Sequence, residues 1–353
     1  IMEKNHKFFA AKERINSFAR LDISQYDEES IIVGIMSSIC KTQTASFEEV
    51  LRALFFDEDL DKSNYFFEFQ KYGLIEDFWR LCLEYFGIKD ENINLRKLLN
   101  YIFVTSTKQS LSDFFPSEWE QLLASKTGNV IAFLENFRNN IQYRERCLEL
   151  AEMVANNLSA ESKFSSVLPE YFLNCDTFSF FDKYIIKWII ERLLDENLSA
   201  QLQGMDILTI CDLRKKMYYG DVFAIHYQVL KYAYQVLQVI PYSCPNNIKD
   251  IIKQYVESDF LIDTYYRKFY YYYDQLKDKT DFEELRDLVE NIYTYKYLDV
   301  IIPEWNKAIV AEEAFPIPLQ SKFYNHYLEN PKIKTVVIIS DALRYELGKN
   351  LVK

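Results

Sequence analysis

The chain has 353 residues, a mass of 42.2 kDa and a net charge of −12, enough for one large or two to three ordinary domains that fold without disulfides or metals. Aromatic residues make up 16% of it, whereas glycine and proline number only 7 and 8, so the composition favours long helices over a turn-rich β fold. The negative charge and the lack of a sustained Lys and Arg run exclude a broad phosphate-binding face, so we expect no direct nucleic-acid binding.

The cysteines and the apolar segments indicate the compartment. The six cysteines lie far apart in the sequence and form no C-x-x-C motif, which is typical of buried thiols in a reducing compartment. No apolar stretch approaches the roughly 20 residues that are needed to span a bilayer, and the first ten residues lack the core of a signal peptide. We therefore expect a cytoplasmic protein without a membrane partner.

Helical periodicity is clear from Ile1 to about Leu60, and we expect the chain to form a bundle or array of many helices. In "TASFEEVLRALFF", Ser46 and Glu49 have the spacing of a capping box before an apolar run. In "DFFPSEWEQLLA", Pro116 takes an early helical position, where a missing N–H costs nothing. Residues Phe180 to Leu198 are apolar on most faces, as in a helix at the centre of a bundle.

Segments rich in Ser, Pro and Asn suggest where the chain divides. The best candidates are residues 158–169 and 239–250. We predict a helical domain over residues 1–240, a Tyr-rich helical hairpin with a connector over 241–330, and the start of an α/β domain over 331–353.

The hairpin contains an unusual density of tyrosines. At 100° per residue, one face of its first helix collects eight apolar or aromatic residues and leaves only Tyr271 on the far side; the eight are Ile262, Tyr265, Tyr266, Phe269, Tyr270, Tyr272, Tyr273 and Leu276. After "DKTD", a second amphipathic helix is expected from about Phe282 to Asp299.

Two interpretations of these tyrosines are possible. They could stack on the bases of single-stranded nucleic acid, or they could form an aromatic helix–helix seam. Seven acidic residues leave no basic groove for a nucleic-acid backbone, which favours the seam; they are Asp259, Asp263, Asp274, Asp278, Asp281, Glu283 and Glu284.

The closing segment differs from everything before it. Residues Thr335 to Ile339 form an apolar, β-branched run without polar alternation, which predicts a strand covered on both faces, as in a parallel sheet. After Asp341, Leu343, Leu347 and Leu351 recur four residues apart and predict a helix. The pattern is the first βα element of an α/β domain.

Asp341 lies where a ligand would bind, because residues just past the carboxyl end of a parallel strand border the binding crevice. A carboxylate there can ligate a divalent cation. Alternatively, Asp341 or Ser340 caps the helix, and spacing alone does not decide between these roles. Arg344 and Glu346 could support the site or be solvated helix charges.

The segment "VVIISDALRYELGKNL" resembles the opening motif of the PglZ domain family of bacterial BREX phage-defence systems. Four earlier patches resemble the helical region that precedes this domain: "HKFFAAKERINSFARL", "IDTYYRKFYYYYD", "LVENIYTYKYLDVIIPEW" and "QSKFYNHYLEN". The terminal motif is specific, whereas the helical patches are much less so.

The resemblance implies an activity and partners. PglZ domains are similar to the alkaline phosphatase superfamily, whose first core strand ends in a metal-binding Asp, so Asp341 would be a ligand of a divalent metal, with Zn the usual expectation. A Ser or Thr would attack a phosphate or related ester with the help of the metals. Other BREX proteins, including a DNA methyltransferase, would be partners.

The chain departs from the family in one respect. The nucleophile and the remaining His and Asp ligands, which the superfamily takes from later strands, are missing, and the three histidines, His6, His226 and His326, lie far apart. We therefore expect an internal piece of a longer protein, with no metal and no activity alone, whose single strand cannot find a sheet within the chain. The alternatives are a scaffolding helical module with a degenerate hydrolase domain, or a minor nucleic-acid contact through the hairpin.

Overall fold

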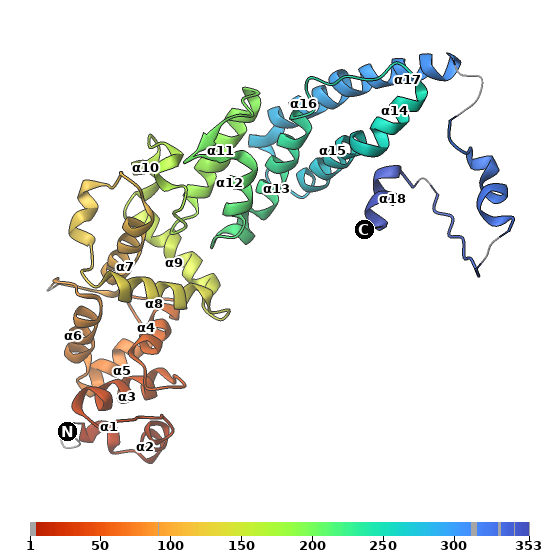
Figure 1. Ribbon diagram of the computed structural model, residues 1–353. Helices are drawn as coiled ribbons and strands as arrows, with labels where there is room; N and C mark the ends of the chain where they lie inside the picture. The colour runs from red at the N-terminus through yellow and green to blue at the C-terminus, as the bar shows by residue number, and fades with distance from the viewer. Residues whose placement is uncertain (1–4, 91, 312–315, 331–332, 342, 353) are drawn as a thin grey trace. The chain divides into compact units, whose positions relative to one another are not determined.

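The structure, a computed structural model, describes residues 5–90, 92–311, 316–330, 333–341 and 343–352. It consists mainly of helices, with a single two-residue hairpin among the described residues (Figure 1). The predicted mainly α fold class is thus confirmed. The chain separates into two compact units, residues 1–181 and 182–353, which are described in turn.

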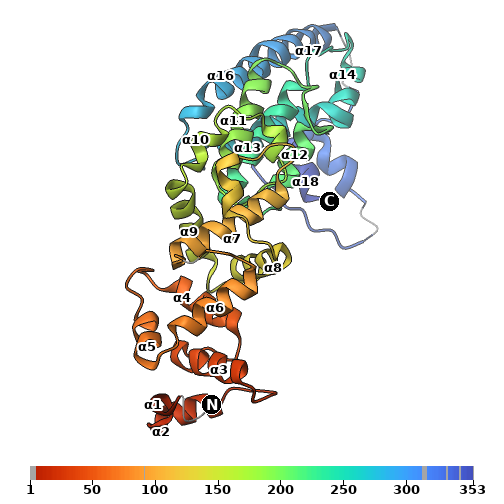
Figure 2. The same cartoon turned by 90° about the vertical axis from the view of Figure 1, so that its left-hand side faces the viewer.

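The first unit contains ten α-helices and two 3₁₀-helices among its described residues before α11 begins at its end. They are α1 (His6–Phe9), α2 (Lys12–Ala19), α3 (Glu28–Cys40), α4 (Phe47–Phe56), α5 (Asn64–Tyr72), α6 (Ile75–Phe86), α7 (Leu95–Ser110), η1 (Ser117–Leu122), α8 (Thr127–Asn139), α9 (Arg144–Asn157), α10 (Ala160–Phe164) and η2 (Pro169–Phe172). Helices α7, α8 and α9 pack on one another (Figure 2).

Local sequence explains where several of these helices begin and end. Asp27 accepts a hydrogen bond from the backbone N–H of Ser30 at 2.8 Å, and Asn94 accepts one from Lys97 at 2.9 Å, so α3 and α7 each start at a side-chain cap. Helices α5 and α6 end at Gly73 and Gly87, whose φ angles of 71° and 68° are left-handed, a conformation that glycine adopts without steric cost.

Two predicted helix starts have a different chemistry from the one expected. Helix α4 begins at Phe47, directly after Ser46, as predicted. The Ser46 side chain, however, makes no capping hydrogen bond. The carboxylate of Glu49 instead accepts a hydrogen bond from the backbone N–H of Thr44 at 3.2 Å. The capping box is therefore wrong, because Glu49 turns to the preceding loop instead. Pro116 comes just before η1, so it starts a short 3₁₀-helix and not an α-helix.

The core of the first unit is largely aromatic. The Phe133 ring, which is 1% exposed, has its centroid 6.0 Å from Phe55, 5.6 Å from Phe86 and 5.9 Å from Phe137. These distances are those of favourable edge and offset ring contacts. One phenylalanine of α8 thus joins α4, α6 and its own next turn in a single cluster.

The second unit contains the remaining elements. They are α11 (Phe180–Leu194), β1 (Gln201–Leu202), β2 (Met205–Asp206), α12 (Ile207–Arg214), α13 (Gly220–Leu237), α14 (Ile248–Gln254), η3 (Tyr255–Asp259), α15 (Phe260–Tyr273), η4 (Thr280–Phe282), α16 (Glu283–Asn291), η5 (Ile292–Leu298), α17 (Asp299–Ala311), η6 (Gln320–Lys322), η7 (Tyr324–Leu328) and α18 (Tyr345–Leu351). Leu202 pairs with Met205 in the antiparallel hairpin. Helix α11 carries fully buried residues such as Ile185 and Ile189, as expected of a central helix.

A buried ion pair lies in the core of the second unit. Arg214 of α12 donates to both carboxylate oxygens of Asp182, at 2.9 and 2.5 Å, and the Tyr227 hydroxyl donates to one of them at 2.5 Å. All three side chains are at most 1% exposed. Burial disfavours the guanidinium charge, but the adjacent Asp182 carboxylate holds the pKa of Arg214 above its ordinary value.

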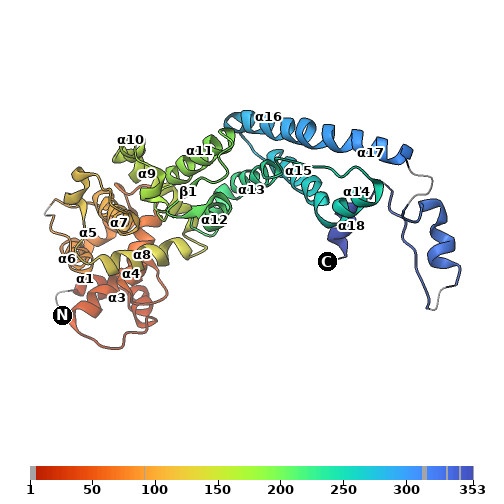
Figure 3. The ribbon, with the colours of Figure 1, turned by 45° about the horizontal axis from the view of Figure 1, so that its top comes forward.

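Two long helical rods lie in the second half of the second unit. One runs without a break through α14, η3 and α15, and the other through α16, η5 and α17 (Figure 3). Each contains one π-helical segment, η3 or η5, in which hydrogen bonds span five residues and the turn is wider. The rods confirm the two predicted hairpin helices: the first begins earlier than expected, at Ile248, and ends at Tyr273, and the second continues past Asp299 to Ala311.

The closing segment, residues 333–341, corrects part of the predicted fold. The expected strand at Thr335–Ile339 is not formed: these residues are extended, exposed and unpaired, while the expected helix forms as α18. The reason is physical, because a strand's N–H and C=O groups need an adjacent strand, and no described strand lies beside them. The predicted βα element is thus present only in its helical half.

The cysteines and the helices were also predicted features. All six cysteines are free thiols, and five of them are buried. None of the helices in the described ranges has both the length and the apolar character that crossing a membrane requires. The domain boundaries near residues 240 and 330 stay predictions.

Candidate ligand pocket

The structure does not bring a metal site together around Asp341. Asp341 is exposed, and the described ranges hold no group of three or more His, Cys, Asp or Glu residues placed to bind a metal ion. Because a single carboxylate cannot complete a coordination sphere, these residues do not fit a metal centre. The alternative role also fails, since α18 starts at Tyr345 with Arg344 as its N-cap, so neither Ser340 nor Asp341 caps it.

Glu346 is not the solvated helix charge that was one of its two interpretations. Its side chain is 1% exposed and its carboxylate lies 3.7 Å from Nε of Arg267 on α15. The neighbouring Tyr345 ring packs on Phe260 at 5.7 Å and on Tyr255 at 5.9 Å. These contacts hold α18 against the first rod.

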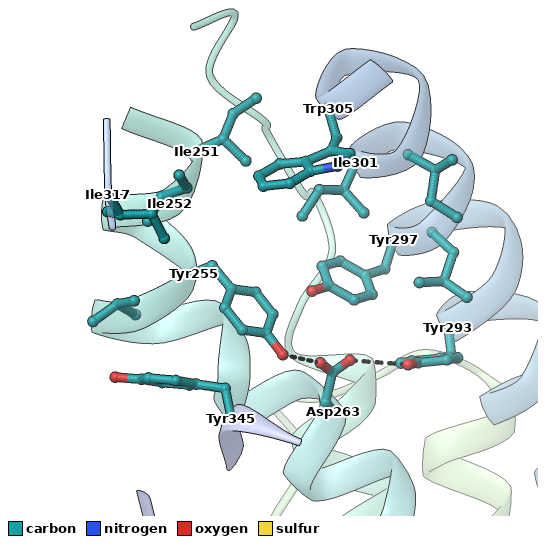
Figure 4. Close-up of a pocket in the computed structure, with 13 residues that line it drawn as sticks. Ile251, Ile252, Tyr255, Asp263, Tyr293, Tyr297, Ile301, Trp305, Ile317 and Tyr345 are labelled. Atoms are coloured by element: carbon teal, nitrogen blue, oxygen red, sulfur yellow. Dashed lines mark hydrogen bonds between the residues drawn. The ribbon is translucent and has the colours of Figure 1, made fainter. Parts of the chain in front are cut away.

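A cavity of about 480 Å³ lies between the two rods (Figure 4). Both π-helical segments contribute to its wall: η3 provides Tyr255 and Val256, and η5 provides Tyr293, Tyr297 and Leu298. Ile317 and Tyr345 close it from the end of the chain. The remaining lining residues are Ile251, Ile252, Asp263, Ile301, Ile302 and Trp305. The lining is therefore almost wholly apolar and aromatic, which is typical of small-molecule sites.

One carboxylate, Asp263, provides the charge in this cavity. Its oxygens accept hydrogen bonds from the hydroxyl groups of Tyr255, at 2.5 Å, and Tyr293, at 2.9 Å. Figure 4 shows both bonds. Burial and the negative charge of Asp263 raise the pKa of both tyrosines. Both phenols thus keep their protons at neutral pH and orient the carboxylate.

A second tyrosine–carboxylate group adjoins the first. Tyr266 and Tyr270 donate to Glu290 at 2.6 and 2.7 Å, and these bonds lower the pKa of Glu290. Burial, followed by the bond to Glu290, raises the pKa of Tyr266 to about 12. The Tyr266 ring also stacks on Tyr293 at 3.7 Å, so this tyrosine belongs to an internal seam, as the packing interpretation predicted.

The sequence contained a signal for this cavity that periodicity at 3.6 residues did not reveal. Four of its lining residues, Tyr293, Tyr297, Ile301 and Trp305, recur at intervals of four. In an α-helix this spacing drifts by about 40° per step, and the wider turn of a π-helical segment reduces that drift. In this rod the π-helical segment helps to keep the four residues on the wall of one cavity.

Among curated proteins, two alkaline phosphatase-like proteins are similar to the chain over nearly its whole length. It is 32% identical over 364 residues to the alkaline phosphatase-like protein PglZ of Bacillus cereus (strain H3081.97), a match that covers 99% of the chain and 42% of the relative. It is 25% identical over 382 residues to the alkaline phosphatase-like protein BrxZ of Escherichia coli O9:H4 (strain HS), covering 99% of the chain and 44% of the relative.

These similarities support the predicted resemblance to the PglZ family. The chain spans less than half the length of either relative. No family model matches it, and no solved structure does.

Proposed function

We propose that the chain is the helical part of a PglZ-like, alkaline phosphatase-like protein that acts in bacterial phage defence of the BREX type in the cytoplasm. The observation that carries this proposal is the 32% identity to a PglZ protein over 99% of the chain. The match covers the helical units as well as the closing motif. A shared catalytic motif alone would not produce similarity in the helical units. The role of these helices in the proposal is to bind other proteins of the defence system.

The hydrolase activity belongs to this proposal only for the full-length protein. There, Asp341 is proposed to ligate a divalent metal, with Zn the first expectation, and the metal would activate the nucleophile and leaving group of a phosphate or related ester. The described residues do not form such a centre, so no catalytic step is derived from them.

The metal assignment is tested on the full-length protein. Asp341→Ala is expected to lower the bound metal per protein at least about tenfold, because loss of one of the few protein ligands of a metal greatly weakens its binding. The measurement is elemental analysis after dialysis, with the exposed Asp299→Ala as the matched control that keeps its metal. Equal metal content in the two variants would contradict the assignment of Asp341.

Two exposed apolar residues near the end of α17 support the interaction role. Ile309 is 38% exposed and the adjacent Val310 is 87% exposed. Exposed apolar residues that gather on a surface are typical of protein-binding sites. The proposed partner is the DNA methyltransferase of the same defence system.

The interaction is tested with the purified methyltransferase immobilised and the 353-residue chain in solution. Val310→Glu is expected to weaken binding about tenfold or more, because it puts an unpaired charge into an apolar contact. The matched control is Ile141→Glu in the other unit, at a side chain that is 95% exposed, and it should leave the affinity unchanged. A chain that does not bind, or a Val310→Glu variant that binds like the control, would refute the proposed interaction.

A further inference from the structure

We propose that the cavity between the two rods binds a small organic cation, with its ammonium group at Asp263 and its apolar body toward Trp305. Figure 4 shows these two residues at opposite ends of the cavity. This binding site goes beyond the proposed function, and it rests on the charge, the rings and the volume of the cavity.

The charge argument starts from Asp263. Its carboxylate makes no ion pair with any Lys, Arg or His in the part of the chain that the structure describes, and its only hydrogen-bond donors there are Tyr255 and Tyr293. A carboxylate offers about four lone-pair positions, so two bonds leave acceptor capacity. A carboxylate in a mostly apolar wall is costly unless a cation approaches it, and a ligand could supply that cation.

The rings near Asp263 are suited to the same ligand. Tyr255, Tyr293, Tyr297 and Tyr345 all line the cavity. Adjacent rings lie at centroid distances of 5.9 Å for Tyr255 and Tyr345 and 5.7 Å for Tyr293 and Tyr297. The faces of aromatic rings attract cations, and cages of such rings recognise quaternary ammonium groups. A phenol that donates to a carboxylate is polarised so that its ring becomes more electron-rich.

The other end of the cavity determines the body of the ligand. Ile251, Ile252, Ile301 and Trp305 provide no charge there. The volume of about 480 Å³ lies in the range of roughly 300–1,000 Å³ that is usual for small-molecule pockets. An alkyl or aryl chain attached to the ammonium group would fill it.

Two charges near the cavity act in opposite directions. Arg344 is exposed and directly precedes Tyr345, which lines the cavity, whereas Glu346 directly follows Tyr345 and is 1% exposed. Glu346 is already paired with Arg267. Arg344 is therefore the charge that opposes a bound cation, and its removal should strengthen binding.

The first experiment isolates the charge of the ligand. Choline and 3,3-dimethylbutan-1-ol have nearly the same shape, but only choline is charged. Isothermal titration of the full 353-residue chain should show choline binding about tenfold more tightly, in line with cation–π contacts in a desolvated site. Equal affinities would overturn the proposal, since the cavity would then be selecting shape alone.

The second experiment isolates the residues. Asp263→Asn should weaken choline binding about tenfold, and Arg344→Gln should strengthen it about twofold. The matched control is Asp274→Asn, at an exposed aspartate that directly follows the same rod and does not line the cavity, and its affinity should not change. If Asp263→Asn binds choline like Asp274→Asn, the proposed site is wrong.

The third experiment examines the apolar end of the cavity. It also tests the proposed binding site if the Asp263→Asn variant does not fold. Lengthening one alkyl arm from tetramethylammonium to hexyltrimethylammonium should raise the affinity about fourfold per methylene while the arm is being buried. In Trp305→Ala this gain should be at least halved. An affinity that does not depend on chain length, or a gain unchanged in Trp305→Ala, would refute the proposed orientation and site.

Discussion

Replacing Asp182 by alanine is expected to lower the free energy of unfolding by about 3–5 kcal/mol, because it leaves a buried guanidinium without its counter-charge. Arg214 is 0% exposed, and the carboxylate of Asp182 holds it through two hydrogen bonds. Tyr227 would also lose the acceptor of its hydroxyl group. Urea denaturation followed by circular dichroism measures the change, provided that the slope of the transition stays constant.

The matched control for this variant is another aspartate of the same unit. Asp212 pairs with Lys215 at 3.1 Å and Lys231 at 3.2 Å but is 45% exposed, so Asp212→Ala should cost less than about 1 kcal/mol. Asp182→Leu combined with Arg214→Met should recover much of the loss, because apolar residues can replace a buried pair. If Asp182→Ala and Asp212→Ala have the same stability, the buried pair does not have the role assigned to it.

Replacing Phe133 by alanine should destabilise the first unit by about 3–5 kcal/mol, the usual cost of removing a fully buried phenylalanine. The lost ring contacts three other phenylalanines, and the space it leaves lies between α4, α6 and α8. Chemical denaturation measures the loss. Hydrogen exchange should locate it as faster exchange of backbone amides in these three helices.

A phenylalanine on the surface of the same unit provides the comparison. Phe67 on α5 is 69% exposed, so Phe67→Ala should change stability by no more than about 0.5 kcal/mol. Phe133→Leu, which refills most of the volume, should fall between the two. A Phe133→Ala variant as stable as Phe67→Ala would mean that the ring cluster is not the core of this unit.

The sequence was sufficient to predict a mainly helical fold and several individual helices, but it did not predict their wider turns. The start of α4 was predicted from a capping-box spacing before an apolar run, and the buried α11 from a segment that is apolar on most faces; both are local properties of the sequence. By contrast, the π-helical segments depend on tertiary packing, since an i to i+5 hydrogen bond has no propensity scale of its own. The hydrogen-bond partner of a side chain was also not predictable from its spacing. Glu49 has the spacing of a capping box, but its carboxylate accepts a hydrogen bond from Thr44.

The candidate site shows the same division between local and tertiary signals. Asp341 could be proposed from a strand pattern and a resemblance, and its role stays a prediction. The sequence showed Asp263 only as one of many acidic residues. Its place in the candidate site depends on its hydrogen bonds to Tyr255 and Tyr293, and Tyr293 lies 30 positions further along the chain. Pairs of that kind become visible only when two helices are placed side by side.

The segment η5 fixes the rotational phase between the two halves of its rod. Deleting one residue within Ile292–Leu298 would let the backbone return to ordinary α-helical turns and would leave Ile301 and Trp305 facing nearly the same way, because the wider turns hold about one extra residue. Deleting one residue between Asp299 and Ile301, at the start of α17, would instead rotate everything that follows by about 100°. The same change in chain length therefore spares the cavity in one part of the rod and turns its wall away in the next.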